Sequence, residues 1–73
     1  MIDQQTQAYI VAAIRHTFVD IAPDLGPCDP EDAAWCCLER CDEYLDLRDR
    51  QALWTLSYAE MMAIAIPVVE DLL

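Results

Sequence analysis

Four cysteines between residues 28 and 41 are the side chains best suited to chemistry. Four thiolates can bind zinc tetrahedrally, and closely spaced pairs can exchange disulfides. Cys36 and Cys37 are adjacent, however, so on a helix they point about 100° apart, and no C-x-x-C pair is present. Cys37 and Cys41 share a helix face with apolar residues, where free cysteine packs as a small hydrophobe. We predict structural cysteines with no metal and no other cofactor; a small Cys-based metal or redox protein is the alternative.

His16 is the single histidine and lies on the polar side of a predicted helix, near Tyr9 and Asp20. A catalytic role would require a nucleophile and an orienting group that converge on it from elsewhere in the fold. No catalytic motif supplies them, so we predict a solvated histidine and a protein that is not an enzyme.

Glu60 lies among apolar residues of a predicted helix, where a carboxylate is costly unless it is paired. One interpretation is an ion pair with Arg15 or Arg48 that fixes packing or a dimer register. The other is that this face is exposed and Glu60 stays in water.

Negative charge is concentrated in residues 29–46. The chain has 14 acidic residues against four arginines and no lysine, a formal net charge of −10. Same-sign charge at this density destabilises a compact state through self-repulsion, so it needs an explanation. It also argues against direct binding to nucleic acid or to anionic membranes, since both require basic patches. The acidic residues of the segment are Asp29, Glu31, Asp32, Glu39, Asp42, Glu43 and Asp46.

The acidic side chains predict a partner-binding face on one helix. Carboxylates at steps of three and four lie about 5–6 Å apart, close to the spacing of about 6–7 Å between phosphates of a DNA strand. Trp35 is predicted beside this face as an anchor for arginines; alternatively its ring packs over a neighbouring helix. The face itself is alternatively plain solvated surface. The predicted partner-binding residues are Asp32, Trp35, Glu39, Asp42, Glu43 and Asp46.

Periodicity and breakers predict an all-α fold, a small three-helix bundle in a single domain over residues 1–73. The expected helices cover about 4–22, ended by Pro23, then 30–45 after the cap Asp29, then 47–66. Pro67 is expected to end or kink the third helix.

The third predicted helix is apolar on more than one face, which indicates burial on more than one side. Two neighbouring helices would cover both faces poorly, so we predict a homodimer or a patch that a partner covers. The alternative is the central helix of a tight monomer.

The chain starts without a basic and apolar leader, and its longest apolar run, 61–69, is far short of the roughly 20 residues that span a bilayer. We expect a cytoplasmic protein with reduced cysteines.

In overall character, carried by the acidic run from Asp29 to Asp46, the chain resembles small phage-encoded inhibitors of the anti-CRISPR and DNA-mimic type. The resemblance implies a non-enzymatic inhibitor in the host-cell cytoplasm. It would occupy a basic nucleic-acid-binding surface of a partner complex and block it by occlusion. A structural or assembly subunit that acts through the apolar third helix is the main alternative.

Overall fold

The computed structural model describes residues 2–73 and contains helices but no strand in that range. The all-α prediction is confirmed, whereas the prediction of three helices is wrong. The described residues form four α-helices and one 3-10 turn: α1 (Gln4–Leu25), α2 (Pro30–Arg40), η1 (Cys41–Tyr44), α3 (Leu47–Trp54) and α4 (Tyr58–Leu72).

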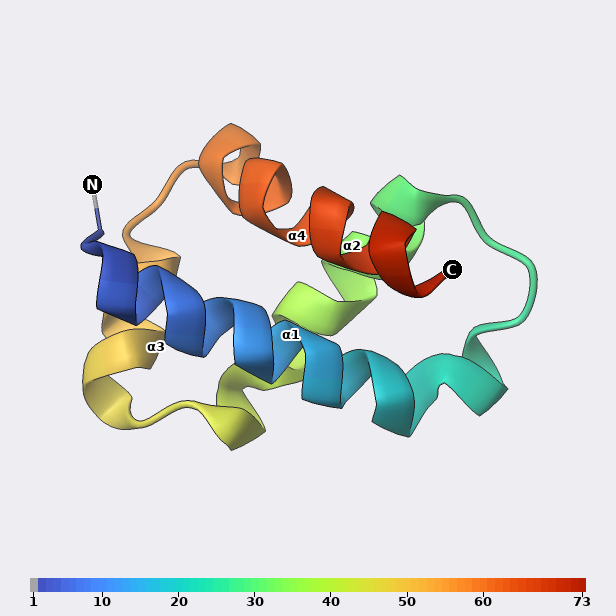
Figure 1. Ribbon diagram of the computed structural model, residues 1–73, viewed down its shortest axis with the longest axis horizontal. Helices are drawn as coiled ribbons and strands as arrows, with labels where there is room; N and C mark the ends of the chain where they lie inside the picture. The colour runs from blue at the N-terminus through green and yellow to red at the C-terminus, as the bar shows by residue number, and fades with distance from the viewer. Residues whose placement is uncertain (1) are drawn as a thin grey trace.

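The longest helix, α1, runs along most of the molecule, and the other elements pack against it (Figure 1). The helices α1, α2 and α4 pack against one another, while α3 lies against the N-terminal part of α1 and η1 lies against its central part. The molecule measures 32 × 22 × 17 Å. Each of the four helices contributes side chains to one apolar core, in which Ile10, Ile14, Leu38, Leu53 and Val69 are fully buried.

The first helix begins as predicted and ends later than predicted. The Asp3 carboxylate accepts a hydrogen bond of 2.7 Å from the Thr6 N–H, which caps the helix. The predicted end before Pro23 is wrong, because α1 continues through Pro23 to Leu25. Pro23 falls in the last turn, where few further hydrogen bonds are at stake, and Gly26 at φ 64° supplies the left-handed residue that ends the helix.

The second helix is shorter than predicted. It starts at Pro30 with the Asp29 cap, but it ends at Arg40 rather than near residue 45, and η1 follows. The Arg50 side chain stabilises this break, since its Nε–H donates to the carbonyls of Asp42 and Leu45, both at 2.9 Å. The Asp42 carbonyl also accepts from the Leu45 N–H at 3.1 Å, whereas the Arg50 bond supplies the Leu45 carbonyl with a partner where no helix continues.

The third predicted helix is two helices, with a bend of 114° between α3 and α4. A capping box forms the break: the Glu60 N–H donates to Ser57 Oγ at 3.1 Å, and the Ser57 N–H donates to Glu60 Oε1 at 2.9 Å. Glu60 is exposed at this break, so the interpretation as an ion pair that fixes packing is wrong. Arg15 pairs with Asp71 instead.

Pro67 does not end the last helix, because α4 continues to Leu72. Pro67 and Ala63, whose carbonyl loses its usual partner at this point, are both exposed, so water can reach that carbonyl. The large bend of this region lies at residues 55–57 rather than near Pro67.

The bend explains how one chain covers an element that is apolar on several sides. Leu53 on α3 and Met61, Ala65 and Val69 on α4 are all buried. Because α3 and α4 take different directions, each turns its apolar side to the same core. The reason for predicting a second copy over this region is thereby removed, and the homodimer itself stays a prediction.

Among residues 2–73, no single helix has the length and apolar content to cross a membrane. The helices α3 and α4 meet that criterion only when they are joined across their bend.

Candidate functional site

Four carboxylates from three elements line one shallow depression, which we call the acidic depression. Its volume is about 360 Å³. Asp20 comes from α1, Glu39 from the end of α2, and Asp42 and Glu43 from η1. The other lining residues are Thr17, Ile21, Arg40 and Tyr44. Three predicted partner-binding residues thus meet at one place, together with Asp20, which the sequence interpretation left as an ordinary solvated residue.

The acidic depression has little internal neutralisation. Glu39 and Glu43 are exposed and form no ion pair within the described part of the chain. Asp42 is partly buried; it accepts a hydrogen bond of 3.1 Å from the indole N–H of Trp54. Asp20 accepts a hydrogen bond from the Tyr44 hydroxyl. The depression therefore gathers four carboxylates beside the single guanidinium of its lining.

The other arginines have partners elsewhere. Arg15 pairs with Asp71 at 3.6 Å, and Arg48 pairs with Asp3 at 3.8 Å. Both pairs are well exposed and add little stability. Arg50 binds backbone carbonyls, as described above.

Asp32 and Trp35 do not line the acidic depression. Asp32 is exposed in the first turn of α2. The Trp35 ring stacks on Tyr58, with centroids 5.4 Å apart, and meets the edge of Trp54 at 6.4 Å. The alternative that this ring packs over a neighbouring helix is therefore the one that the structure shows.

Asp46 has a structural role as well as being a predicted partner-binding residue. It caps α3, since its carboxylate accepts a hydrogen bond of 2.9 Å from the Asp49 N–H. With α2 ending at Arg40, the predicted acidic residues do not form one helical edge. Asp46 lies instead at a second groove.

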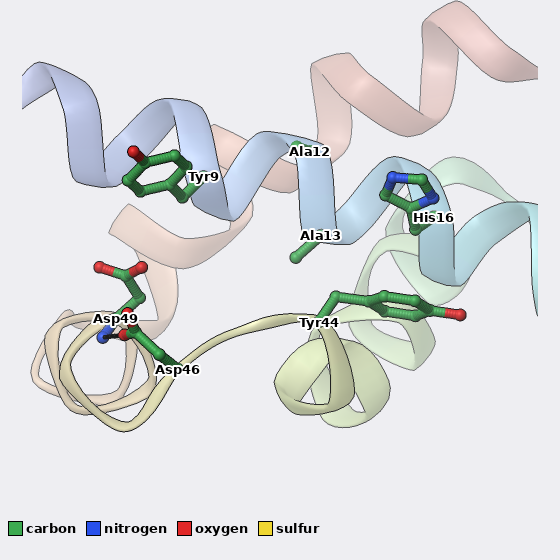
Figure 2. Close-up of a pocket in the computed structure, with 7 residues that line it drawn as sticks. All are labelled: Tyr9, Ala12, Ala13, His16, Tyr44, Asp46 and Asp49. Atoms are coloured by element: carbon green, nitrogen blue, oxygen red, sulfur yellow. Dashed lines mark hydrogen bonds between the residues drawn. The ribbon is translucent and has the colours of Figure 1, made fainter.

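This second groove, the Tyr9–Asp49 groove, lies between α1 and the η1–α3 segment and has a volume of about 460 Å³ (Figure 2). Tyr9 and His16 of α1 stand on either side of two alanines, which leave the space open. The His16 ring stacks on Tyr44, with centroids 5.3 Å apart. The lining residues are Tyr9, Ala12, Ala13, His16, Tyr44, Asp46 and Asp49. Tyr44 also lines the acidic depression, so the two hollows are neighbours.

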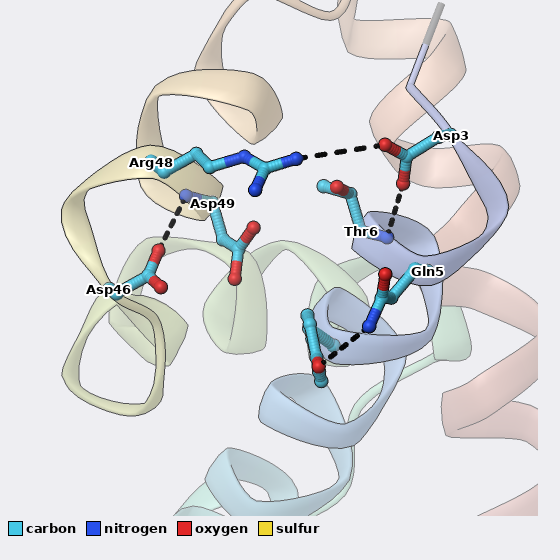
Figure 3. Close-up of polar contacts among 7 residues, drawn as sticks. Asp3, Gln5, Thr6, Asp46, Arg48 and Asp49 are labelled. Carbon is cyan, nitrogen blue, oxygen red and sulfur yellow. Dashed lines mark hydrogen bonds and ion pairs between the residues drawn. The ribbon is translucent and has the colours of Figure 1, made fainter.

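Asp49 is the unusual member of this groove. Asp49 is only 7% exposed, and its carboxylate is directed from α3 toward α1 on the Tyr9 side (Figure 2). Burial, followed by the charge of Asp46, raises the pKa of Asp49 above its usual value. The neighbouring Arg48 turns to Asp3 (Figure 3), and no cationic side chain of residues 2–73 forms an ion pair with Asp49. The sequence signal was limited to an acid in the first turn of a helix.

The cysteines belong mainly to the core. Cys37 and Cys41 are fully buried, which confirms the packing interpretation for these two. Burial raises the pKa of the Cys37 thiol to about 11 and that of Cys41 to about 12. Cys28 and Cys36 are partly buried. No group of three or more histidine, cysteine or acidic side chains in residues 2–73 is arranged to hold a metal ion.

Comparison of the chain with protein-family models, with curated proteins and with solved structures gave no match.

Proposed function

We propose that this protein is a non-enzymatic inhibitor that binds a basic, nucleic-acid-binding surface of a partner complex and blocks it by occlusion, as the resemblance to anti-CRISPR and DNA-mimic proteins implies. The observation that carries the proposal is the gathering of Asp20, Glu39, Asp42 and Glu43 around one depression with a single arginine among them. Carboxylates that the fold leaves without counter-ions are available to a cationic partner.

The geometry revises how such binding would work. A straight edge of carboxylates on one helix is absent, because α2 ends at Arg40. The charges instead come from α1, α2 and η1 and surround a concave surface, which suits basic side chains that enter it. Long-range attraction to a net charge of −10 would speed association and make it sensitive to salt.

An assembly subunit remains the second candidate, and one observation favours it. Trp54 and Tyr58 are 43% and 48% exposed and lie side by side with Trp35 at the junction of α2, α3 and α4. Half-exposed tryptophan and tyrosine often anchor protein interfaces. Under this alternative the acidic residues would keep the protein soluble.

Charge reversal distinguishes the two candidates. The double variant Glu39→Lys/Glu43→Lys changes two exposed side chains that form no ion pair with another residue in the range 2–73. Its matched control, Asp24→Lys/Glu70→Lys, makes the same change of charge at exposed positions outside the acidic depression. Each immobilised protein is incubated with a bacterial lysate at low salt, and each captured protein is purified and tested for competition between duplex DNA and the inhibitor.

The proposal expects a DNA-binding protein that the wild type and the control variant bind in competition with DNA and that the double variant does not. Capture that is equal for all three proteins, or that DNA does not compete with, would contradict it and favour the assembly subunit.

A further inference from the structure

We propose that the Tyr9–Asp49 groove receives the side chain of an arginine from the protein partner, with its guanidinium between the aromatic rings and the carboxylates of Asp46 and Asp49. The inference rests on the proposed function and names a specific contact within it. Binding of a partner at the acidic depression does not depend on this second contact.

The groove combines the two features that a guanidinium needs. Its walls are the rings of Tyr9, His16 and Tyr44, and its floor between them is Ala13, which is buried. Carboxylates enter from the α3 side, where Figure 2 shows Asp46 and Asp49 next to each other. A flat cation can therefore lie against a ring face while it donates hydrogen bonds to the carboxylates.

Asp49 is the second, independent reason for a ligand. Asp49 is 7% exposed as a residue, and a charged side chain with so little contact with water is normally paired, because burial of an isolated charge is costly. Asp49 has a carboxylate neighbour, Asp46, and the attraction of Arg48 only partly offsets it, without an ion pair to Asp49 within residues 2–73. Arg48, on the same turn, is held by Asp3 at 3.8 Å (Figure 3). An incoming cation would provide the missing partner.

The composition of the groove selects among cations. A metal ion would find two carboxylates, but the rings and alanines around them are poor ligands for it. Lysine offers a compact ammonium that cannot stack, whereas the planar guanidinium of arginine can stack and bind a carboxylate with two parallel hydrogen bonds. The groove therefore favours arginine.

Two peptides test the inference on the full chain. One is a hexapeptide of alternating glycine and arginine, and the other has lysine in place of arginine. Each is titrated into isotope-labelled protein, and amide shifts are followed by NMR at low salt. We expect the arginine peptide to bind more tightly and to shift residues 9–16 and 44–49 most strongly.

Three variants isolate the groove. Asp49→Asn keeps the shape of the side chain and should lower the affinity for the arginine peptide roughly tenfold, since hydrogen bonds to charged groups are strong. Glu70→Gln removes the same charge from an exposed site on α4 and should change the affinity little. Ala12→Leu fills the groove from an exposed position without a change of charge. It should abolish the preference for the arginine peptide over the lysine peptide. Circular dichroism verifies that each variant is folded.

Equal affinities for the two peptides, or equal losses in Asp49→Asn and Glu70→Gln, would overturn the inference. If both peptides still bind Glu39→Lys/Glu43→Lys more weakly than they bind the wild type, the proposed function stands without the groove. Absence of binding by either peptide to the wild type would overturn both proposals.

Discussion

The ring of Trp35 on α2 stacks on the ring of Tyr58 at the start of α4, with centroids 5.4 Å apart and an angle of 16° between the planes. The Tyr58 hydroxyl also donates a hydrogen bond of 3.2 Å to Glu31, one turn before Trp35. Trp54 meets Trp35 edge-on from the end of α3. This cluster ties α2 to both sides of the break at residues 55–57, so it helps to fix the bend that lets α3 and α4 share one core.

Removing the Tyr58 ring should destabilise the fold although half of it is exposed. Aromatic pairs contribute about 0.5–1.5 kcal/mol beyond the area that they bury, so we expect Tyr58→Ala to lower the free energy of unfolding by at least that amount. Tyr58→Phe keeps the stack and should cost less. Urea unfolding followed by circular dichroism gives the values. Tyr9→Ala, at a similarly exposed tyrosine outside the cluster, is the control, and an equal loss there would refute the role of the stack.

The capping box at the start of α4 makes the second prediction. Ser57→Ala removes the hydroxyl that accepts the Glu60 N–H, and loss of such a cap costs about 1 kcal/mol. Ser57→Asp supplies another capping oxygen and should retain most of the stability. Thermal unfolding compares the two variants. If Ser57→Asp were as unstable as Ser57→Ala, the cap would not be the cause.

Acid should weaken the same contact in a defined direction. Hydrogen bonds from Ser57 hold the pKa of Glu60 below its usual value of 4.5. Glu60 therefore contributes stability that is fully present above pH 4.5 and is lost as the pH falls through its lower pKa in the folded state. Glu60→Gln keeps an acceptor for the Ser57 N–H and should lose less stability on acidification. Denaturant midpoints between pH 6 and pH 3 test this, and parallel curves for the two proteins would contradict it.

Thiol chemistry provides the fourth prediction. Cys37 and Cys41 are fully buried with raised pKa values, so both should resist alkylation in the folded protein, whereas Cys28 and Cys36 should react first. Above pH 9 the unfolded chain releases thiol protons that the folded chain retains, so stability should fall as the pH rises toward about 11 and 12. Mass spectrometry after brief iodoacetamide treatment counts the labelled sites. Rapid labelling of Cys37 or Cys41 at neutral pH would contradict their burial.

The helical class, the caps at Asp3, Asp29 and Asp46, and the buried Cys37 and Cys41 were predictable from the sequence, because they depend on local spacing and side-chain chemistry. Pro23 and Pro67 misled the prediction, since Pro23 lies in the last turn of α1 and the Ala63 carbonyl that Pro67 leaves unpaired is on an exposed part of α4. The capping box from Ser57 to Glu60 was readable as S-x-x-E, but the apolar run around it resembled one continuous helix.

The site was predictable only in part. Glu39, Asp42 and Glu43 are neighbours in sequence, and their clustering followed from that. Asp20 and Tyr44 join them through packing of α1 on η1, a contact between residues 24 positions apart that no local pattern reveals. The segment that follows α2 is held by Arg50, whose side chain reaches back to two carbonyls from outside it. Burial of Asp49 is likewise a consequence of tertiary packing.

The affinity for a purified DNA-binding partner, measured against salt for the wild type, Glu39→Lys/Glu43→Lys and the control Asp24→Lys/Glu70→Lys, tests the central claim most directly. Like charges brought together at an interface cost several kcal/mol, so the double variant should bind at least roughly 100-fold more weakly at low salt. The wild type and the control should bind alike and lose affinity together as salt increases. Equal affinity of all three proteins, or an affinity for the wild type that salt does not change, would contradict the account.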